Sequence, residues 1–134
     1  MRLWHQDLID KLPRQQLLSQ HRECCALRGK GWGKKHSTVD YVFEYDPARL
    51  VAYHYLIIEE MIGRGYNPDM KWVEENYRGK NLASDNDFCS PSDVEWALRT
   101  KGNIYPEHDS EYLQECVDNL HSKECVCRYM EEVM

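Results

Sequence analysis

Two kinds of motif are missing from this sequence of 134 residues. It contains neither GxGxxG nor GxxxxGK followed by Ser or Thr, the glycine-rich motifs that hold nucleotide phosphates. It also contains no CxxC pair, because its six cysteines fall into a vicinal pair, a CxC and two single positions. CxxC spacing is typical of zinc sites, whereas an isolated cysteine often fills a core as a small hydrophobic residue. We therefore expect no cofactor and no metal, with one alternative, a zinc cluster of Cys116, His121, Cys125 and Cys127.

Long apolar runs are missing as well. The first twenty residues include Asp7, Asp10, Lys11 and Arg14 and contain no apolar run long enough for a signal peptide or a membrane span. We therefore expect a cytoplasmic protein without membrane contact, and in that compartment disulfide bonds are improbable. The hydrophobic content of 42% and the chain length are typical of one compact domain, so we expect a single domain over residues 1–134 and a monomer.

Charge is distributed unevenly along the chain. Residues 1–36 hold eight basic and three acidic side chains, a net of +5, and since the whole chain carries −6 the remainder carries −11. A basic segment on an acidic protein is typical of a surface that binds phosphates, although a solvated charge cluster is the simpler interpretation of charge alone. The basic side chains are Arg2, Lys11, Arg14, Arg22, Arg28, Lys30, Lys34 and Lys35.

Local signals predict a mostly helical protein. A helix over residues 13–28 contains no glycine or β-branched residue and precedes Gly29. A longer helix over residues 46–63 carries an apolar stripe, which places it in the centre of the core, and Gly65 is its expected cap. Further helices are expected over residues 69–77, 92–98 and 107–128, with a long loop over residues 78–93. The predicted class is all-α, a single compact domain of a few packed helices with long connecting loops.

Two polar side chains lie on the apolar faces of these helices. His54 falls within the stripe of the longer helix, which favours a hydrogen-bonded core histidine without a chemical role. Glu23 lies on the same side of the first helix as Gln16 and Leu27, next to Arg22. A carboxylate in such surroundings is a candidate for acid–base chemistry, and a salt bridge between helices is the alternative.

Four segments of the sequence carry a family resemblance. They are LxxQxLLSQHRE, KKH, YDPARLVAYHYLIIEEMIGRGYNP and IYPEHDSEYLQECVDNL. In this order and at nearly these separations they resemble the pyrimidine-dimer DNA glycosylase family, over most of residues 1–120. The most specific element is the Arg22-Glu23 pair, followed by a long helix that ends in RGYN. The resemblance implies a compact all-α fold, base excision from damaged duplex DNA, with cyclobutane pyrimidine dimers as the expected lesion, and a linked AP-lyase activity.

The resemblance also implies the reacting groups. In that family the nucleophile is the N-terminal α-amine, here that of Met1, and a nearby glutamate, here Glu23, assists sugar opening and β-elimination. An α-amine suits this role because its reference pKa is about 7.7–8.0, against about 10.4 for lysine, so part of it is uncharged at neutral pH. Neither a metal nor a cofactor is required. The candidate DNA-binding residues are Arg2, Arg14, His21, Arg22, Arg28, Lys34 and Lys35.

Two other functions stay open on the residues alone. One is a helical DNA-binding module without catalysis, and the other is a small domain that binds proteins through its acidic surface. Cleavage of an abasic site separates the enzyme from both alternatives. DNA binding separates the two alternatives from each other.

Overall fold

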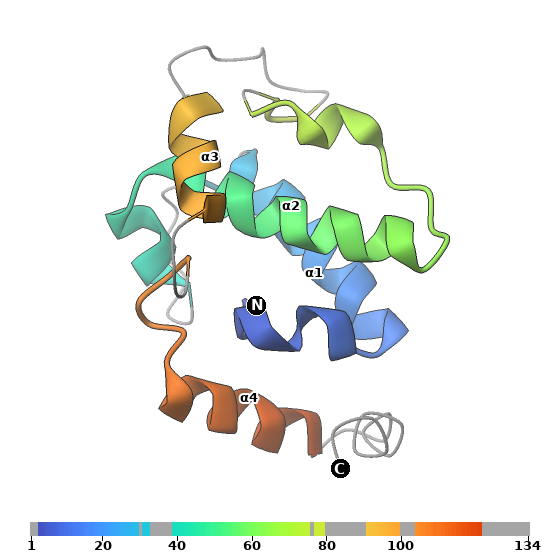
Figure 1. The fold of residues 1–134 in the computed structure, drawn as a ribbon, viewed down its shortest axis with the longest axis vertical. Coiled ribbons are helices and arrows are strands. Elements are labelled where there is room, and N and C mark those ends of the chain that lie inside the picture. The colour runs from blue at the N-terminus through green and yellow to red at the C-terminus, as the bar shows by residue number, and fades with distance from the viewer. Residues whose placement is uncertain are drawn as a thin grey trace.

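The structure is a computed structural model that describes residues 3–29, 31–32, 39–75, 77–79, 91–99 and 104–121. These residues form four α-helices and three short 3-10 helices and no strand, so the predicted all-α class is confirmed (Figure 1). None of the described helices combines the length and the apolar character needed to cross a membrane. In chain order the elements are η1 (Gln6–Lys11), α1 (Arg14–Arg28), η2 (Asp40–Glu44), α2 (Pro47–Gly63), η3 (Met70–Val73), α3 (Pro91–Arg99) and α4 (Ser110–His121).

The two long helices begin and end where the local signals predicted. α1 follows Pro13, and the N–H of Gly29 donates to two carbonyl oxygens of its last turn. α2 begins at Pro47, and the side chain of Asp46 accepts a hydrogen bond from an N–H of the first turn at 2.9 Å. At the other end Gly65 has a φ of 88°, which glycine adopts without strain, and its N–H donates back to α2. Both predicted helices are therefore confirmed.

α2 is the central element of the core. It packs against α1 and α3, and Figure 1 shows it crossing the middle of the molecule between them. Its first half is buried on all sides, because residues 50–54 are consecutive and all buried, whereas Ile57, Ile58 and Met61 in its second half lie on one face. The buried apolar side chains of α2 are Ala48, Leu50, Val51, Ala52, Tyr53, Ile57, Ile58 and Met61.

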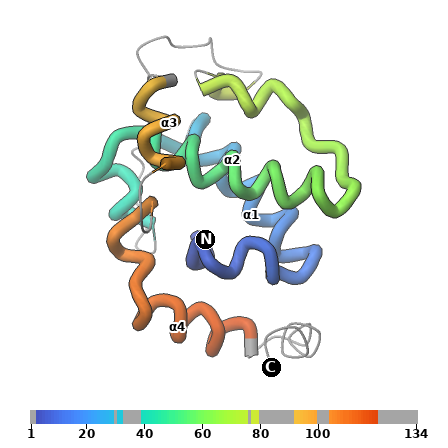
Figure 2. Tube along the Cα trace, in the orientation of Figure 1, coloured from blue at the N-terminus to red at the C-terminus, as the bar shows by residue number. Residues whose placement is uncertain are grey.

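The N-terminal segment, which we define as residues 3–12, lies between α4 and the pair of α1 and α2 (Figures 1 and 2). It contains η1 and buries Leu3, Leu8 and Leu12. The start of the described chain is therefore part of the core.

Among the shorter elements, α3 confirms the helix expected over residues 92–98, whereas the others differ from the prediction. The helix expected over residues 69–77 is only the 3-10 turn η3, and α4 begins at Ser110, three residues later than expected. η1 and η2 were not predicted, because a 3-10 helix of five or six residues is too short to show a clear period. Residues 80–90 of the expected loop and residues 122–128 of the expected last helix lie outside the described residues.

Candidate active site at the N-terminal segment

Hydrogen bonds from three helices hold the start of the N-terminal segment. The N–H of Trp4 donates to Oε1 of Gln20 on α1 at 2.7 Å, and its carbonyl oxygen accepts from the hydroxyl of Tyr53 on α2 at 2.6 Å. The hydroxyl of Tyr112 on α4 donates to the carbonyl oxygen of Leu3 at 2.5 Å. Leu3 and Trp4 are also buried. The backbone just after residue 2 is therefore fixed by both side-chain packing and directed hydrogen bonds.

An aromatic cluster supports the same segment from the side of α4. The ring of His5 stacks on that of His108, with centroids 5.7 Å apart and planes at 28°, and His108 stacks in turn on Tyr112. The Tyr41 hydroxyl lies 2.7 Å from Nε2 of His108. Burial, with a smaller contribution from His5, lowers the pKa of His108 to about 3. His108 is therefore a neutral packing partner at physiological pH.

Gln20 connects the N-terminal segment to Glu23. Its side chain is fully buried, its Oε1 accepts from the N–H of Trp4, and it shares with the carbonyl oxygen of Trp4 the single hydrogen of the Tyr53 hydroxyl, which lies 2.9 Å away. An N–H can only donate, so the contact with Trp4 fixes which end of the amide is the oxygen. The amide nitrogen therefore faces Glu23 and donates to its Oε2 at 2.9 Å. One amide group thus separates the anchored backbone from the predicted catalytic carboxylate.

Glu23 was predicted to belong to the site, whereas Gln20 was not. Gln20 stands three positions before Glu23 on α1, a spacing that lets the two side chains meet. Its partner Trp4 is 16 residues away in the sequence, so only the fold brings the two together. Met1, the predicted nucleophile, lies outside the described residues, as does Arg2.

Two of the predicted DNA-binding residues lie on the described surface. Arg22 is exposed and donates to Oγ of Ser19 at 3.1 Å. Arg14 is also exposed, with its guanidinium 5.6 Å from the ring centre of Tyr66. Both arginines are therefore within reach of a phosphate in solution. Lys34 and Lys35 lie outside the described residues.

The prediction for Arg28 is wrong. Arg28 is fully buried, and its guanidinium donates to the carbonyl oxygens of Trp72, Glu74 and Tyr77 at 2.7, 2.7 and 3.2 Å. The guanidinium also lies 5.1 Å from the ring centre of Trp72. A buried guanidinium with these partners is not available to a DNA phosphate. Arg28 instead attaches η3 and the residues after it to the end of α1.

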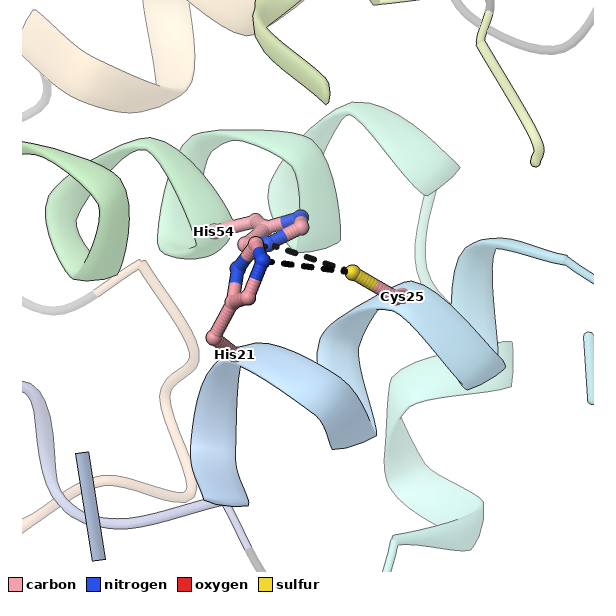
Figure 3. Close-up of side chains that lie close together, drawn as sticks. All are labelled: His21, Cys25 and His54. Carbon is pink, nitrogen blue, oxygen red and sulfur yellow. Dashed lines mark hydrogen bonds between the residues drawn. The ribbon is translucent and has the colours of Figure 1, made fainter. Parts of the chain in front are cut away.

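His21 meets His54 between α1 and α2 (Figure 3). His21 is one of the residues predicted to bind DNA. Its Nδ1 lies 2.8 Å from Nε2 of His54, so the ring of His21 faces the neighbouring helix. His54 is fully buried and its Nδ1 lies 3.1 Å from the Arg28 guanidinium, which confirms the predicted hydrogen-bonded core histidine. The pKa of His21 is lowered, mainly by burial and then by the nearby arginines. The pKa of His54 is lowered more strongly, by burial, by Arg28 and by His21. Both rings are therefore neutral near pH 7.

Cys25 stands beside this histidine pair. Its Sγ lies 3.8 Å from Nε2 of His21 and 3.9 Å from Nε2 of His54. Burial is the main reason why the pKa of the Cys25 thiol rises to about 12. In the alternative zinc cluster, Cys116 is buried in the core, and Cys125 and Cys127 lie outside the described residues.

Comparison with known proteins adds one finding. Residues 1–74 match the sequence model of a family described as pyrimidine dimer DNA glycosylase. The match covers more than half of the 134 residues and includes the N-terminal segment, Gln20 and Glu23. No curated protein and no solved structure is significantly similar to the chain.

Proposed function

The chain belongs to the pyrimidine dimer DNA glycosylase family, and we propose that it excises cyclobutane pyrimidine dimers from duplex DNA and then cleaves the strand as an AP lyase. The observation that carries this proposal is the bridge made by Gln20. It holds the backbone of Trp4 and the carboxylate of Glu23 at the two ends of one amide. This bridge supports the proposal because it ties the backbone of Trp4, three residues after the α-amine, to a carboxylate on α1.

The nucleophile of this proposal is the α-amine of Met1. Three residues separate it from the anchored N–H of Trp4, so it lies within about 11 Å of that atom in any conformation. The uncharged amine attacks C1′ of the damaged nucleotide, and the C–N bond forms as the glycosidic bond breaks and the base leaves. Loss of a proton from the nitrogen and opening of the sugar ring then leave an imine between Met1 and C1′.

Glu23 is the acid–base group. Its carboxylate first assists the opening of the sugar and then removes a proton from C2′ of the imine. The released electron pair forms a double bond to C3′ and expels the phosphate from that carbon, which breaks the strand. The hydrogen bond from Gln20 supports this role because a donor stabilises the carboxylate form and fixes its direction.

Basic side chains near this site hold the DNA. In the proposed complex Arg2 and Arg22 contact phosphates beside the lesion, and Arg14, Lys34 and Lys35 contact the backbone farther away. The target nucleotide must leave the stack, which costs a few kcal/mol and costs least at a damaged step. The exposure of Arg22 and Arg14 supports their part in this arrangement.

Borohydride trapping tests the nucleophile. Added during reaction with duplex DNA that contains an abasic site, borohydride should reduce the imine and join protein to DNA, and mass spectrometry should place the adduct on Met1. Acetylation of the α-amine should abolish trapping, because a blocked nitrogen cannot attack. A Lys11→Gln variant is the matched control and should still trap, since Lys11 contacts Asp10 at 3.3 Å and has no part in the mechanism. An adduct on a lysine, or full activity after acetylation, would contradict the assignment of Met1.

The Glu23→Gln variant tests the carboxylate. It should keep its fold and its affinity for DNA but lose glycosylase activity by at least ~10²-fold, as expected for a lost acid–base group. Strand cleavage and DNA binding are measured on the same preparation. Unchanged activity would remove Glu23 from the mechanism, and DNA binding without trapping by the parent protein would instead identify a non-catalytic DNA-binding module.

A further inference from the structure

Three possible metal ligands converge between α1 and α2. His21 and Cys25 stand four residues apart on α1 and so share one face of that helix, and His54 meets them from α2 (Figure 3). We call these three residues the His–Cys cluster. One ligand atom from each lies within 4.8 Å of the others. His21 and Cys25 are half-buried, so the cluster is open to solvent on one side.

Both nitrogen–sulfur separations are close to those of a tetrahedral zinc site. With bonds of about 2.0–2.1 Å to nitrogen and about 2.3 Å to sulfur, a tetrahedral ion holds a nitrogen and a sulfur ligand about 3.6 Å apart. In the His–Cys cluster the sulfur of Cys25 lies 3.8 and 3.9 Å from the two Nε2 atoms. Shifts of a few tenths of an ångström are therefore enough for both nitrogen–sulfur pairs. The open side leaves the fourth position to water.

The contact with Arg28 determines the protonation of the metal-free cluster. A guanidinium can only donate, so Nδ1 of His54 accepts from Arg28, and Nε2 of the neutral ring carries the proton and donates to His21. An ion on Nε2 of His54 must displace that proton, which ends the hydrogen bond to His21 as well as the one that Arg28 donates. Arg28 keeps its carbonyl partners, and the two lost hydrogen bonds, one of them from a charged group, weaken binding by about 30- to 2000-fold. This loss is smaller than the affinity that histidine and cysteine ligands provide for zinc.

We propose that the His–Cys cluster binds a thiophilic divalent cation of the Zn²⁺ class, with Cys25 as a thiolate, and that the ion links α1 to α2. Sulfur and imidazole ligands favour such an ion over Mg²⁺ or Ca²⁺, which take oxygen ligands. Glu23 stands midway between His21 and Cys25 in sequence, and at 100° per residue it points to the opposite side of α1. The ion is therefore a structural link that takes no part in the reaction, and the inference holds whether or not the proposed function does.

Cobalt spectroscopy tests the ligands directly. The parent protein for this test carries serine in place of three cysteines that lie outside the described residues, Cys89, Cys125 and Cys127. These replacements remove thiols that would compete for the metal. One equivalent of Co²⁺ should produce sulfur-to-cobalt charge-transfer absorption and the intense visible bands of tetrahedral cobalt. Both should vanish in Cys25→Ser and persist in Cys24→Ala, whose thiol is buried in the core. Bands that persist in Cys25→Ser, or no bands in the parent, would overturn the proposal.

Thermal unfolding tests the link between the helices. Zn²⁺ should raise the unfolding midpoint of the parent relative to EDTA, because a ligand that binds only the native state stabilises it. The half-exposed His21→Gln change should remove that shift, and it serves as a second variant if Cys25→Ser does not fold. A midpoint unaffected by zinc in the parent would refute the structural link. Activity on abasic DNA should persist in EDTA. If EDTA abolished the activity and zinc restored it, the claim that the ion takes no part in the reaction would be refuted.

Discussion

Replacing Gln20 by glutamate separates the two contacts that this side chain makes. The variant keeps the length of the side chain and an oxygen that accepts from the N–H of Trp4 and the hydroxyl of Tyr53. It loses the NH₂ group that donates to Glu23 at 2.9 Å. The N-terminal segment should therefore stay anchored while Glu23 loses the group that directs it.

The structure gives the size of the expected effect. A lost hydrogen bond to a charged group costs about 1.5–3 kcal/mol. A second carboxylate oxygen 2.9 Å from Oε2 of Glu23 adds a repulsion of about 1.4 kcal/mol in water-like surroundings and about 6 kcal/mol at an effective dielectric constant of 20. Glu23 is half-buried, so the repulsion lies between these limits. The hydrogen bond alone slows the step that needs Glu23 by about 10- to 150-fold.

Two readouts on abasic duplex DNA distinguish positioning from a general loss of structure. Borohydride trapping in the Gln20→Glu variant should stay within a few-fold of the parent, whereas the rate of β-elimination should fall by the factor above. The deficit should shrink at lower pH, because the two carboxyl groups can then share a proton. Tyr53→Phe is the control, since it leaves the contact between Gln20 and Glu23 in place. Elimination at the parental rate in Gln20→Glu would refute the positioning role, whereas a parent that neither traps nor cleaves would refute the proposed function itself.

Two further predictions concern pH and salt. Burial lowers the pKa of His108 to about 3 and that of His54 in the same direction, so the unfolded chain takes up protons that the native protein does not. The free energy of unfolding should therefore fall as the pH drops below about 6.5, and His108 alone should account for a loss of about 1.4 kcal/mol at about pH 5.5. An unfolding midpoint that is constant from about pH 8 to about pH 5 would contradict this prediction. Arg22→Ala should reduce the magnitude of the salt slope of DNA binding by about one unit, and an unchanged slope would remove Arg22 from the interface.

Local signals were sufficient for the long helices. Proline at the start of α2, the Asp46 side chain and the left-handed Gly65 act on neighbouring residues, so their effect can be predicted without knowing the rest of the fold. Glu23 was also accessible, because its helix face follows from the period of α1. The short 3-10 helices were not, since their conformation depends on the packing of the N-terminal segment and its neighbours.

Contacts between distant residues account for what was missed. Arg28 was expected at the surface because arginine is rarely fully buried, but carbonyl oxygens 44 to 49 residues farther along the chain provide its partners. Gln20 was overlooked because its partner Trp4 precedes it by 16 residues. The His–Cys cluster has no CxxC spacing and unites two positions of α1 with His54, which follows 29 residues after Cys25. Only the packing of α1 on α2 places these groups together.

The hydrogen bond between Tyr112 and Leu3 has a consequence for the order of biosynthesis. The two residues are 109 positions apart, so at about 5–20 residues per second a ribosome takes roughly 5–20 s to make the chain between them. During that time Leu3 has been made while its tyrosine partner does not yet exist. Leu3 and the segment that follows it therefore gain this contact only late in synthesis, and until then the proposed nucleophile at Met1 is open to co-translational acetylation.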